Sequence, residues 1–318
     1  MTKRGSGLRW RTERPRYENM DGVRLENSFS SLRQWQKERR AKKKDLSYQV
    51  PQAVPDLDYL RSNREQVSIT WIGHATFLIQ IGGLNIVTDP VWANRMGFAK
   101  RLAPPGLDIS RLPDMDVVLI SHGHYDHLDF PSLRKLPGQP VVYAPVGLRD
   151  KLRRKGFKTA EEFSWWDKVS KDGVTFTFVP AQHWTRRTLT DTNTSHWGGW
   201  VICGRKPEPV IYFAGDSGYF RGFREIGKRF DIDYALMPIG AYEPEWFMAM
   251  QHVTPEEAVQ ALEDCRGKVM VPMHYGAFRL ADDTPKEALD RLYAEWQRRG
   301  LPADRLRCLR HGETLRDE

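Results

Sequence analysis

Three histidines and an aspartate lie within six consecutive residues of this 318-residue chain, as His122, His124, Asp126 and His127. Imidazoles this close repel one another when protonated, and they lose hydration without compensation when buried neutral. A bound cation removes the conflict, because neutral imidazole nitrogens and carboxylate oxygens are ordinary ligands of divalent metals. Histidines two residues apart can turn both rings toward one ion, and the adjacent Asp126 and His127 can reach a second. The cluster therefore predicts a site for two metal ions.

Three more potential ligands stand just beyond apolar segments that we expect to be strands. They are His183 after residues 174–179, Asp216 after residues 210–213, and His274 after residues 269–273. The first cluster has the same placement, because it follows the apolar segment 117–120. Ligands in α/β folds gather at strand ends. We therefore expect all these side chains to meet in space.

The elements that must position these ligands alternate between strand-like and helix-like segments. Short apolar runs are predicted as strands, most of them continuous and therefore buried on both faces. These runs are residues 67–71, 76–81, 84–87, 117–120, 141–143, 174–179, 200–203, 210–213, 234–237 and 269–273. Thr254 and Thr284 each precede a proline and stand three residues before a glutamate, which predicts a capped helix start at both. The expected fold class is α/β, a mixed sheet with helices on its outer faces.

The constellation resembles the metallo-β-lactamase superfamily, whose HxHxDH signature is matched by residues 122–127. The resemblance implies a four-layer αββα sandwich with a dinuclear metal site at the strand ends. It implies one zinc ion held by His122, His124 and His183, and a second held by Asp126, His127 and His274. By the same resemblance Asp216 bridges the two ions, and Asp89 orients ligands from outside them. Imidazole-rich ligands favour zinc, although iron or manganese would also fit.

A closer resemblance, over about residues 65–315, is to the family of N-acyl-phosphatidylethanolamine-hydrolysing phospholipases D. The strings that carry it are residues 71–76, 88–92, 121–129, 182–184, 225–230, 238–244 and 251–253. It implies that the distal phosphodiester bond of N-acyl-phosphatidylethanolamine, or of a related phospholipid, is hydrolysed to phosphatidic acid and an N-acylethanolamine. A hydroxide bridging two zinc ions would attack phosphorus. Asp126 and Asp216 would be ligands that also accept a proton.

Two other functions compete with this one. A metal-dependent lactonase or a small phosphoester hydrolase of the same superfamily would use the same metals on a polar substrate. A metal-sensing or membrane-binding protein without enzymatic activity is a third alternative, against which the complete ligand set argues.

One histidine outside the ligand set stands beside an apolar group. His252 lies between Trp246, Phe247 and their neighbours and the helix start at Thr254, where free backbone N–H groups favour an anion. We assign His252 to catalysis and to phosphate contact, the alternative being a loop histidine bonded to a helix end. The apolar group suits either a lipid-facing loop or ordinary core. The predicted substrate-binding set is Tyr125, Trp246, Phe247, Gln251 and His252.

Charge separates a basic N-terminal arm, residues 1–55, from a hydrolase domain, residues 56–318. The first 50 residues contain 14 Lys and Arg and 6 Asp and Glu. The difference between these numbers equals the formal net charge of the whole chain, +8. The arm includes Trp10 and Trp35 and suits an anionic membrane surface, unless it serves only for solubility. We expect no nucleic-acid partner, because the known nucleases of the superfamily carry a large inserted domain for which this chain has no room.

Composition assigns the chain to the globular class, with 40% hydrophobic and 28% charged residues. Its apolar runs fall far short of the roughly 18 residues needed to span a bilayer, and we recognise no secretory signal. We expect a cytoplasmic protein that associates peripherally with a membrane. The sequence leaves a homodimer open.

Overall fold

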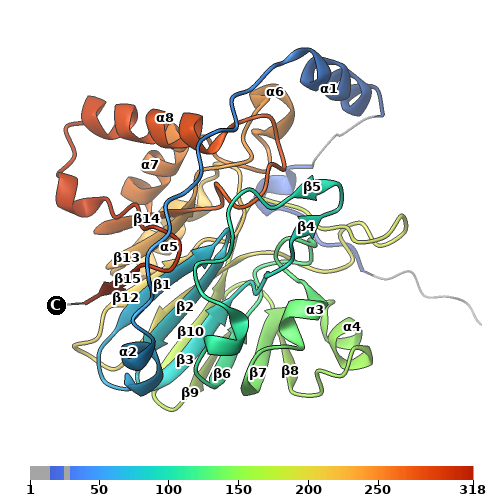
Figure 1. Ribbon diagram of the computed structural model, residues 1–318. Coiled ribbons are helices and arrows are strands. Elements are labelled where there is room, and N and C mark those ends of the chain that lie inside the picture. The colour runs from blue at the N-terminus through green and yellow to red at the C-terminus, as the bar shows by residue number, and fades with distance from the viewer. Residues whose placement is uncertain (1–14, 25–28, 318) are drawn as a thin grey trace, which may run out of the picture.

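The computed structural model describes residues 15–24 and 29–317, which contain two large β-sheets packed face to face (Figure 1). The first sheet has seven strands in the order β15-β1-β2-β3-β6-β7-β8. These strands are β1 (Ser68–Gly73), β2 (Thr76–Ile81), β3 (Leu84–Thr88), β6 (Met115–Leu119), β7 (Gly138–Pro145), β8 (Ala160–Phe163) and β15 (Thr314–Arg316). Its first strands, β1 to β3, form an antiparallel meander, and β3, β6, β7 and β8 are parallel neighbours.

The second sheet has six strands in the order β14-β13-β12-β11-β10-β9. They are β9 (Lys168–Lys171), β10 (Val174–Val179), β11 (Gly199–Cys203), β12 (Val210–Phe213), β13 (Tyr234–Pro238) and β14 (Val269–Met273). Strands β9 to β12 are antiparallel to their neighbours, whereas β12, β13 and β14 are parallel. The predicted mixed character of the sheet is confirmed.

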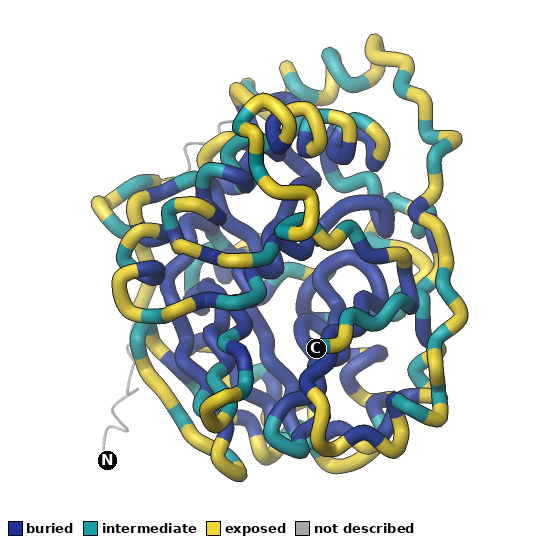
Figure 2. Tube along the Cα trace, turned by 90° about the vertical axis from the view of Figure 1, so that its left-hand side faces the viewer, coloured by how far each residue is buried: buried dark blue, intermediate teal, exposed yellow. Residues whose placement is uncertain are grey.

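Alternate residues of the central strands pack into two separate apolar clusters. Phe77 of β2 and Val117 of β6 belong to the core that also contains the aromatic residues of the second sheet. Their neighbours Leu78 and Val118 belong to a cluster on the other face of the first sheet. Because side chains of a strand point alternately to its two faces, a continuously apolar strand is buried on both. Figure 2 shows the strands as the buried centre, with exposed residues on loops and outer helix faces.

Helices cover both outer faces and complete the four layers. They are α2 (Leu57–Ser62), α3 (Phe130–Leu133), α4 (Arg149–Arg154), α5 (Gly222–Arg229), α7 (Pro255–Asp264) and α8 (Pro285–Arg298), with the 3-10 turns η2 (Ile109–Arg111) and η3 (Ala303–Arg305). In Figure 1, α7 and α8 lie outside β13 and β14, and α3 and α4 lie beside β7 and β8. Thr254 and Thr284 form the predicted capping boxes. The α/β four-layer sandwich is thereby confirmed.

Several strands have no counterpart in the predicted pattern. The hairpin β4 (Arg95–Met96) and β5 (Ala99–Lys100) is too short to show periodicity, and β9 has an exposed lysine, Lys168, and a half-buried one, Lys171. β15, near the carboxyl end of the chain, pairs with β1 and makes β1 an inner strand. These short polar strands are held by pairing with a neighbour, which a local apolar pattern cannot reveal.

The part of the basic arm that the structure describes lies against the two-sheet body. It contains η1 (Met20–Gly22) and α1 (Phe29–Ala41), which lies near α6 (Glu245–Met248) (Figure 1). Trp35 of α1 stacks on Phe247 at 5.0 Å between ring centroids and donates through Nε1 to Asp282 Oδ2 at 3.1 Å. Trp10 lies outside the described residues, and the domain boundary at residue 55 stays a prediction. No helix of the described part is long and apolar enough to cross a bilayer.

Candidate metal centre

Strands that run in the same direction bring the predicted ligands to one edge of the two sheets. In the first sheet β3 and β6 are parallel, and Asp89 and His122 follow their carboxyl ends. In the second sheet β12 and β14 are each parallel to β13, and Asp216 and His274 follow them. β10 runs in the direction of β12, because both are antiparallel to β11, and His183 follows it. Chain direction therefore collects side chains that are far apart in sequence.

Two groups of side chains with metal-ligand chemistry meet at this edge. The first group is His122, His124 and His183, and the second is His74, Asp126, His127 and His274; within each group the ligating atoms lie within 4.8 Å of one another. Asp216 lies between the groups, with Oδ2 3.1 Å from His127 Nε2 and 3.8 Å from His183 Nε2. Its Oδ1 is 3.2 Å from His274 Nε2. The structure brings together all seven side chains predicted as ligands and adds His74.

Ring nitrogens in this cluster face one another. His122 Nε2 and His183 Nε2 lie 2.9 Å and 3.2 Å from His124 Nδ1. His127 Nε2 lies 3.3 Å from His274 Nε2. Facing lone pairs, or facing N–H groups, repel, and one shared proton cannot satisfy three rings. A divalent cation between such atoms is bound by imidazole nitrogen and carboxylate oxygen, so the donor set fits a metal ion.

Burial and neighbouring charges divide these histidines into two kinds. Burial lowers the pKa of His124 to about 4 and that of His183 to about 3, so both rings are neutral at pH 7. Burial also lowers the pKa of His274, but the carboxylates of Asp216 and Asp126 outweigh it and raise that pKa to about 9. Positive charge is thus favoured between the two carboxylates. A divalent ion can supply it in place of the proton.

A further set of contacts orients the ligands. Asp89 accepts hydrogen bonds from Ser121 N at 2.7 Å, from Ser121 Oγ at 2.5 Å and from His127 Nδ1 at 2.7 Å. His127 Nε2 is thereby turned toward Asp216. His183 Nδ1 likewise bonds to Gln251 O at 2.9 Å, which leaves Nε2 facing the cluster. Such partners fix the tautomer and the ring orientation of a ligand, and Asp89 lies where the family resemblance expects an orienting residue.

Three residues of the site have a left-handed backbone: His74 (φ 56°), Asp89 (φ 32°) and His274 (φ 64°). Such a conformation costs non-glycine residues about 1–3 kcal/mol and persists where surrounding contacts impose it. Here His274 N donates to His74 O at 3.1 Å, and Thr76 Oγ1 donates to Asp89 O at 2.7 Å. The backbone at these strand ends therefore directs the side chains of His74, Asp89 and His274 toward the cluster.

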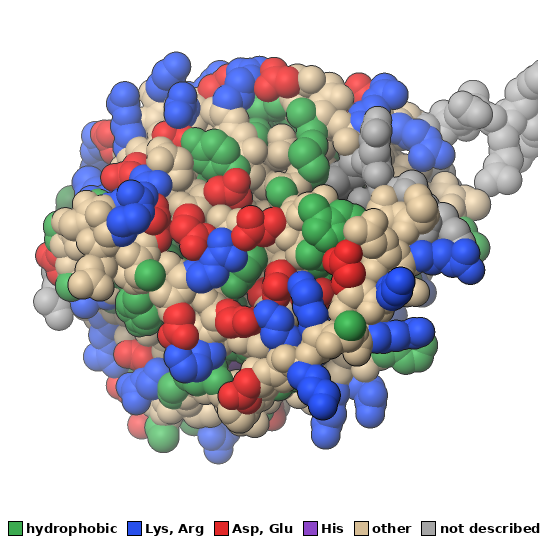
Figure 3. Space-filling view, turned by 90° about the horizontal axis from the view of Figure 1, so that it is seen from above, with side chains coloured by type: hydrophobic (Ala, Val, Ile, Leu, Met, Phe, Trp, Pro, Cys, Tyr) green, Lys and Arg blue, Asp and Glu red, His purple; other side chains and the backbone are tan. Residues whose placement is uncertain are grey.

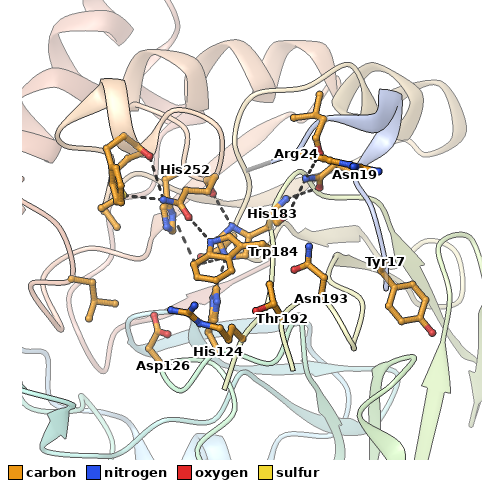
Figure 4. Close-up of a pocket in the computed structure, with 18 of the residues that line it drawn as sticks. Tyr17, Asn19, Arg24, His124, Asp126, His183, Trp184, Thr192, Asn193 and His252 are labelled. Atoms are coloured by element: carbon orange, nitrogen blue, oxygen red, sulfur yellow. Dashed lines mark hydrogen bonds and ion pairs between the residues drawn. The ribbon is translucent and has the colours of Figure 1, made fainter. Parts of the chain in front are cut away.

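The candidate centre forms one side of a cavity of about 890 Å³. Its polar side contains His124, Asp126, His183, Asp216, His252 and His274. An apolar side is formed by Leu32, Trp35, Phe247, Met248 and Leu280. Most of the remaining wall belongs to the segment 16–24 and to the loop that follows His183, as Figure 4 shows for Asn19, Arg24, Trp184 and Asn193. The cavity thus joins a metal-type site to an apolar surface.

The predicted substrate contacts divide between the cavity and its surroundings. Phe247, Gln251 and His252 line the cavity, and His252 Nδ1 is 3.9 Å from Asp216 Oδ2. Tyr125 and Trp246 do not line it and are half exposed. The Tyr125 hydroxyl donates to Arg187 O, and Trp246 Nε1 donates to Glu38 on α1. The difference arises because side chains adjacent in sequence point in different directions on α6 and on the ligand loop.

Two residues with clear roles at the site were not predicted. Arg187 donates through Nη1 to the carbonyl oxygens of Gly123 and Leu128, each at 2.9 Å, and so ties the two ends of the loop that carries the ligand cluster. Arg187 lies only four residues after the candidate ligand His183, and this proximity in sequence could have indicated that it belongs to the site. Asn19 bonds to the backbone of His183 across 164 positions of sequence, for which no local signal exists.

Comparison with known proteins supports the interpretation of this cluster as a metal site. Residues 84–275 match the β-lactamase superfamily domain. An N-acyl-phosphatidylethanolamine-hydrolyzing phospholipase D of Caenorhabditis elegans is 37% identical over 66% of this chain, which spans 64% of that protein's length. A UPF0173 metal-dependent hydrolase of Methanopyrus kandleri is 32% identical over 69% of this chain and 88% of its own.

A solved structure shows the same fold. Igni18, a metallo hydrolase of Ignicoccus hospitalis, superposes with a TM-score of 0.59 at 23% identity, over 80% of this chain and 99% of its own. The matched domain, residues 84–275, includes the ligand cluster and the central strands of both sheets. The two-sheet sandwich and the candidate ligands at the strand ends agree with this match. The chain therefore belongs to the metallo-β-lactamase superfamily.

Proposed function

We propose that the protein is a phosphodiesterase of the phospholipase D type that acts on N-acyl-phosphatidylethanolamine or a related phospholipid. The supporting observation is the shared cavity, which is lined both by the apolar side chains of Leu32, Trp35 and Phe247 and by the His/Asp cluster. A substrate with both a phosphodiester and an alkyl chain would use both sides. A small polar lactone would leave the apolar side without a role.

The donor set would hold two metal ions, and zinc suits it best. The first would take His122, His124 and His183, and the second Asp126, His127 and His274, with Asp216 between them. Metal ions bound there would neutralise charge on the phosphate and lower the pKa of a coordinated water molecule. Iron or manganese remains an alternative for the same ligands.

The protein's own groups would orient the substrate and handle protons. His252 Nδ1 is buried and has no hydrogen-bond partner among the described residues, so it is free to bond to a phosphate oxygen or to a water molecule. Asp216 and Asp126 stand beside it as proton acceptors. Phe247 and Trp35, stacked on each other, would contact the alkyl chain and exclude water from the reacting bond.

The decisive experiment combines product analysis with a pair of matched variants. N-acyl-phosphatidylethanolamine should yield phosphatidic acid and N-acylethanolamine, and diacylglycerol as the primary product would contradict the assignment. Phe247→Ala should raise KM for this lipid several-fold while leaving a water-soluble phosphodiester unaffected. Trp246→Ala, outside the cavity on the same helix, is the control. Turnover of a lactone without any phosphodiester cleavage would favour the lactonase alternative.

We further propose peripheral attachment to an anionic membrane through the arm. Arg39, Lys42 and Lys44 pair with body carboxylates, which reduces the charge available. Among the described residues on or just after α1, three exposed cations have no acidic partner: Lys37, Arg40 and Lys43, here called the exposed arm cations. The face seen from above carries interspersed Lys, Arg, Asp and Glu (Figure 3), so attraction would be local to the arm. Arg9, Arg11 and Arg14 lie outside the described residues.

A further inference from the structure

One side chain of the arm reaches the backbone of a candidate metal ligand. Asn19 is 8% exposed and lies beside His183 at the edge of the cavity (Figure 4). Its Nδ2 donates to His183 O at 2.9 Å, and its Oδ1 accepts from His183 N at 2.9 Å. Both backbone polar groups of His183 are therefore held by a single amide, as a neighbouring strand would hold them.

The same amide has no unused hydrogen-bonding capacity. Oδ1 also accepts from Trp197 Nε1 at 2.8 Å, and Nδ2 also donates to Val23 O at 3.1 Å. An asparagine side chain offers two donor hydrogens and two acceptor sites, and all four are used here. Because the group is buried, the loss of any one bond would leave a polar atom without a partner.

The segment that carries Asn19 is itself fixed to the loop after His183. Tyr17 N donates to Asn193 O at 2.8 Å, and Arg16 donates to Thr192 O at 2.8 Å. The Tyr17 ring stacks on His196 with 4.7 Å between centroids. These contacts fix residues 16 and 17, just before Asn19, so this part of the segment 15–24 can hold a defined position against the site.

Asn19 also completes the restraint on the His183 ring. His183 Nδ1 bonds to Gln251 O, which fixes the rotation of the imidazole, whereas Asn19 fixes the peptide groups from which that imidazole projects. Together these two contacts set where Nε2 lies relative to His124 Nδ1, 3.2 Å away.

We propose that Asn19 is a positioning residue for the candidate metal centre, acting through His183. The segment 15–24 is then part of the catalytic unit, in addition to any role of the arm at a membrane. The proposal rests on the metal binding proposed above, and it is independent of the substrate. Partners that orient a metal ligand typically contribute about 10- to 100-fold to metal affinity, and a loss in that range is expected when Asn19 is replaced by an apolar side chain of similar size.

The test measures binding of Zn²⁺ and of Co²⁺ to the full-length protein by competition with a chromophoric chelator. Asn19→Leu should weaken one of two metal equivalents by about 10- to 100-fold and leave the other near the wild-type value. It should also change the visible absorption of the Co²⁺ form, since the first ligand group is displaced. Asp21→Asn, which removes an exposed ion pair with Arg221 in the same segment, is the matched control and should change neither.

A second variant separates positioning from folding. Asn19→Asp keeps the acceptor for His183 N but places a buried carboxylate oxygen against His183 O, so a loss of metal affinity at least as large as that of Asn19→Leu is expected while the metal-free protein still melts cooperatively. Wild-type affinity for both equivalents in a folded Asn19→Leu or Asn19→Asp variant would overturn the proposal. So would a wild-type protein that binds no metal. A protein that binds metal normally but does not cleave phospholipid would overturn the proposed function and leave the role of Asn19 intact.

Discussion

Arg187 offers the sharpest test of how the ligand loop is held. Its Nη1 donates to Gly123 O and Leu128 O at 2.9 Å and approaches His124 O at 3.2 Å. The guanidinium also lies 4.0 Å from the centroid of the Tyr125 ring. One side chain thus bridges Gly123 and Leu128, between which three of the candidate ligands lie. Replacing it by methionine keeps much of the apolar stem and removes every one of these bonds.

The expected loss of stability follows from these contacts. The two hydrogens of Nη1 can make two good bonds, and hydrogen bonds from a charged group contribute about 1.5–3 kcal/mol each. The contact with Tyr125 adds about 0.5–1 kcal/mol. Because Arg187 is only partly buried, water recovers some of this energy. We therefore expect Arg187→Met to lower the free energy of unfolding by about 3–5 kcal/mol, which a domain of ordinary stability survives.

Urea unfolding followed by tryptophan fluorescence measures this loss. Arg187→Lys, which retains the charge without the planar group, should lie between methionine and wild type. Arg186→Met is the matched control, because Arg186 is exposed and loses only a contact at 5.6 Å from the Trp184 ring centroid, so stability should change by less than about 1 kcal/mol. Bound metal should fall in parallel with the loss at Arg187. An Arg187→Met protein within about 1 kcal/mol of wild type would refute the reasoning, since the loop would then hold its shape without the guanidinium.

Three further predictions concern the metals, acid stability and the arm. The purified protein should contain about two metal ions per chain, and His124→Ala or Asp216→Asn should abolish activity and reduce metal content with the fold kept; full activity in metal-free protein would contradict this. Burial lowers the pKa of His196 to about 3 in the folded protein. In the unfolded chain this pKa is about 6.5, so between these two values the unfolded chain binds a proton that the folded protein does not. As the pH decreases through this range, the free energy of unfolding decreases by about 1.4 kcal/mol per pH unit, until about pH 3. Between pH 7 and pH 5 the free energy of unfolding of His196→Phe should therefore decrease by about 2 kcal/mol less than that of the wild type. If calorimetry showed the same pH dependence of stability for both proteins, His196 would not be the buried neutral group. Changing the exposed arm cations to glutamine should weaken binding to anionic vesicles at low salt by up to about 1 kcal/mol per charge, with little effect at 1 M salt; unchanged vesicle sedimentation would leave the arm without a membrane role.

The comparison of sequence with structure shows which features are local. The ligand cluster at residues 122–127 is contiguous, so its composition alone indicated metal chemistry. The capping boxes at Thr254 and Thr284 depend on residues three positions apart, and they formed as predicted. Continuous apolar runs became strands buried on both faces, because a strand buried in this way needs apolar side chains at consecutive positions, and these can be recognised in the sequence. Superfamily membership followed from the same local strings.

The shape of the cavity depended on contacts that no local pattern contains. Asn19 and His183 are 164 positions apart, and Trp35 of the arm meets Phe247 only because α1 packs near α6. Trp246 and Phe247 are neighbours in sequence, yet only the second faces the cavity. Sequence determined which groups could bind metal, since that is a property of side-chain type and spacing. Tertiary structure decided which groups surround them, since hydrogen bonds and packing act over a few ångströms of space regardless of distance along the chain.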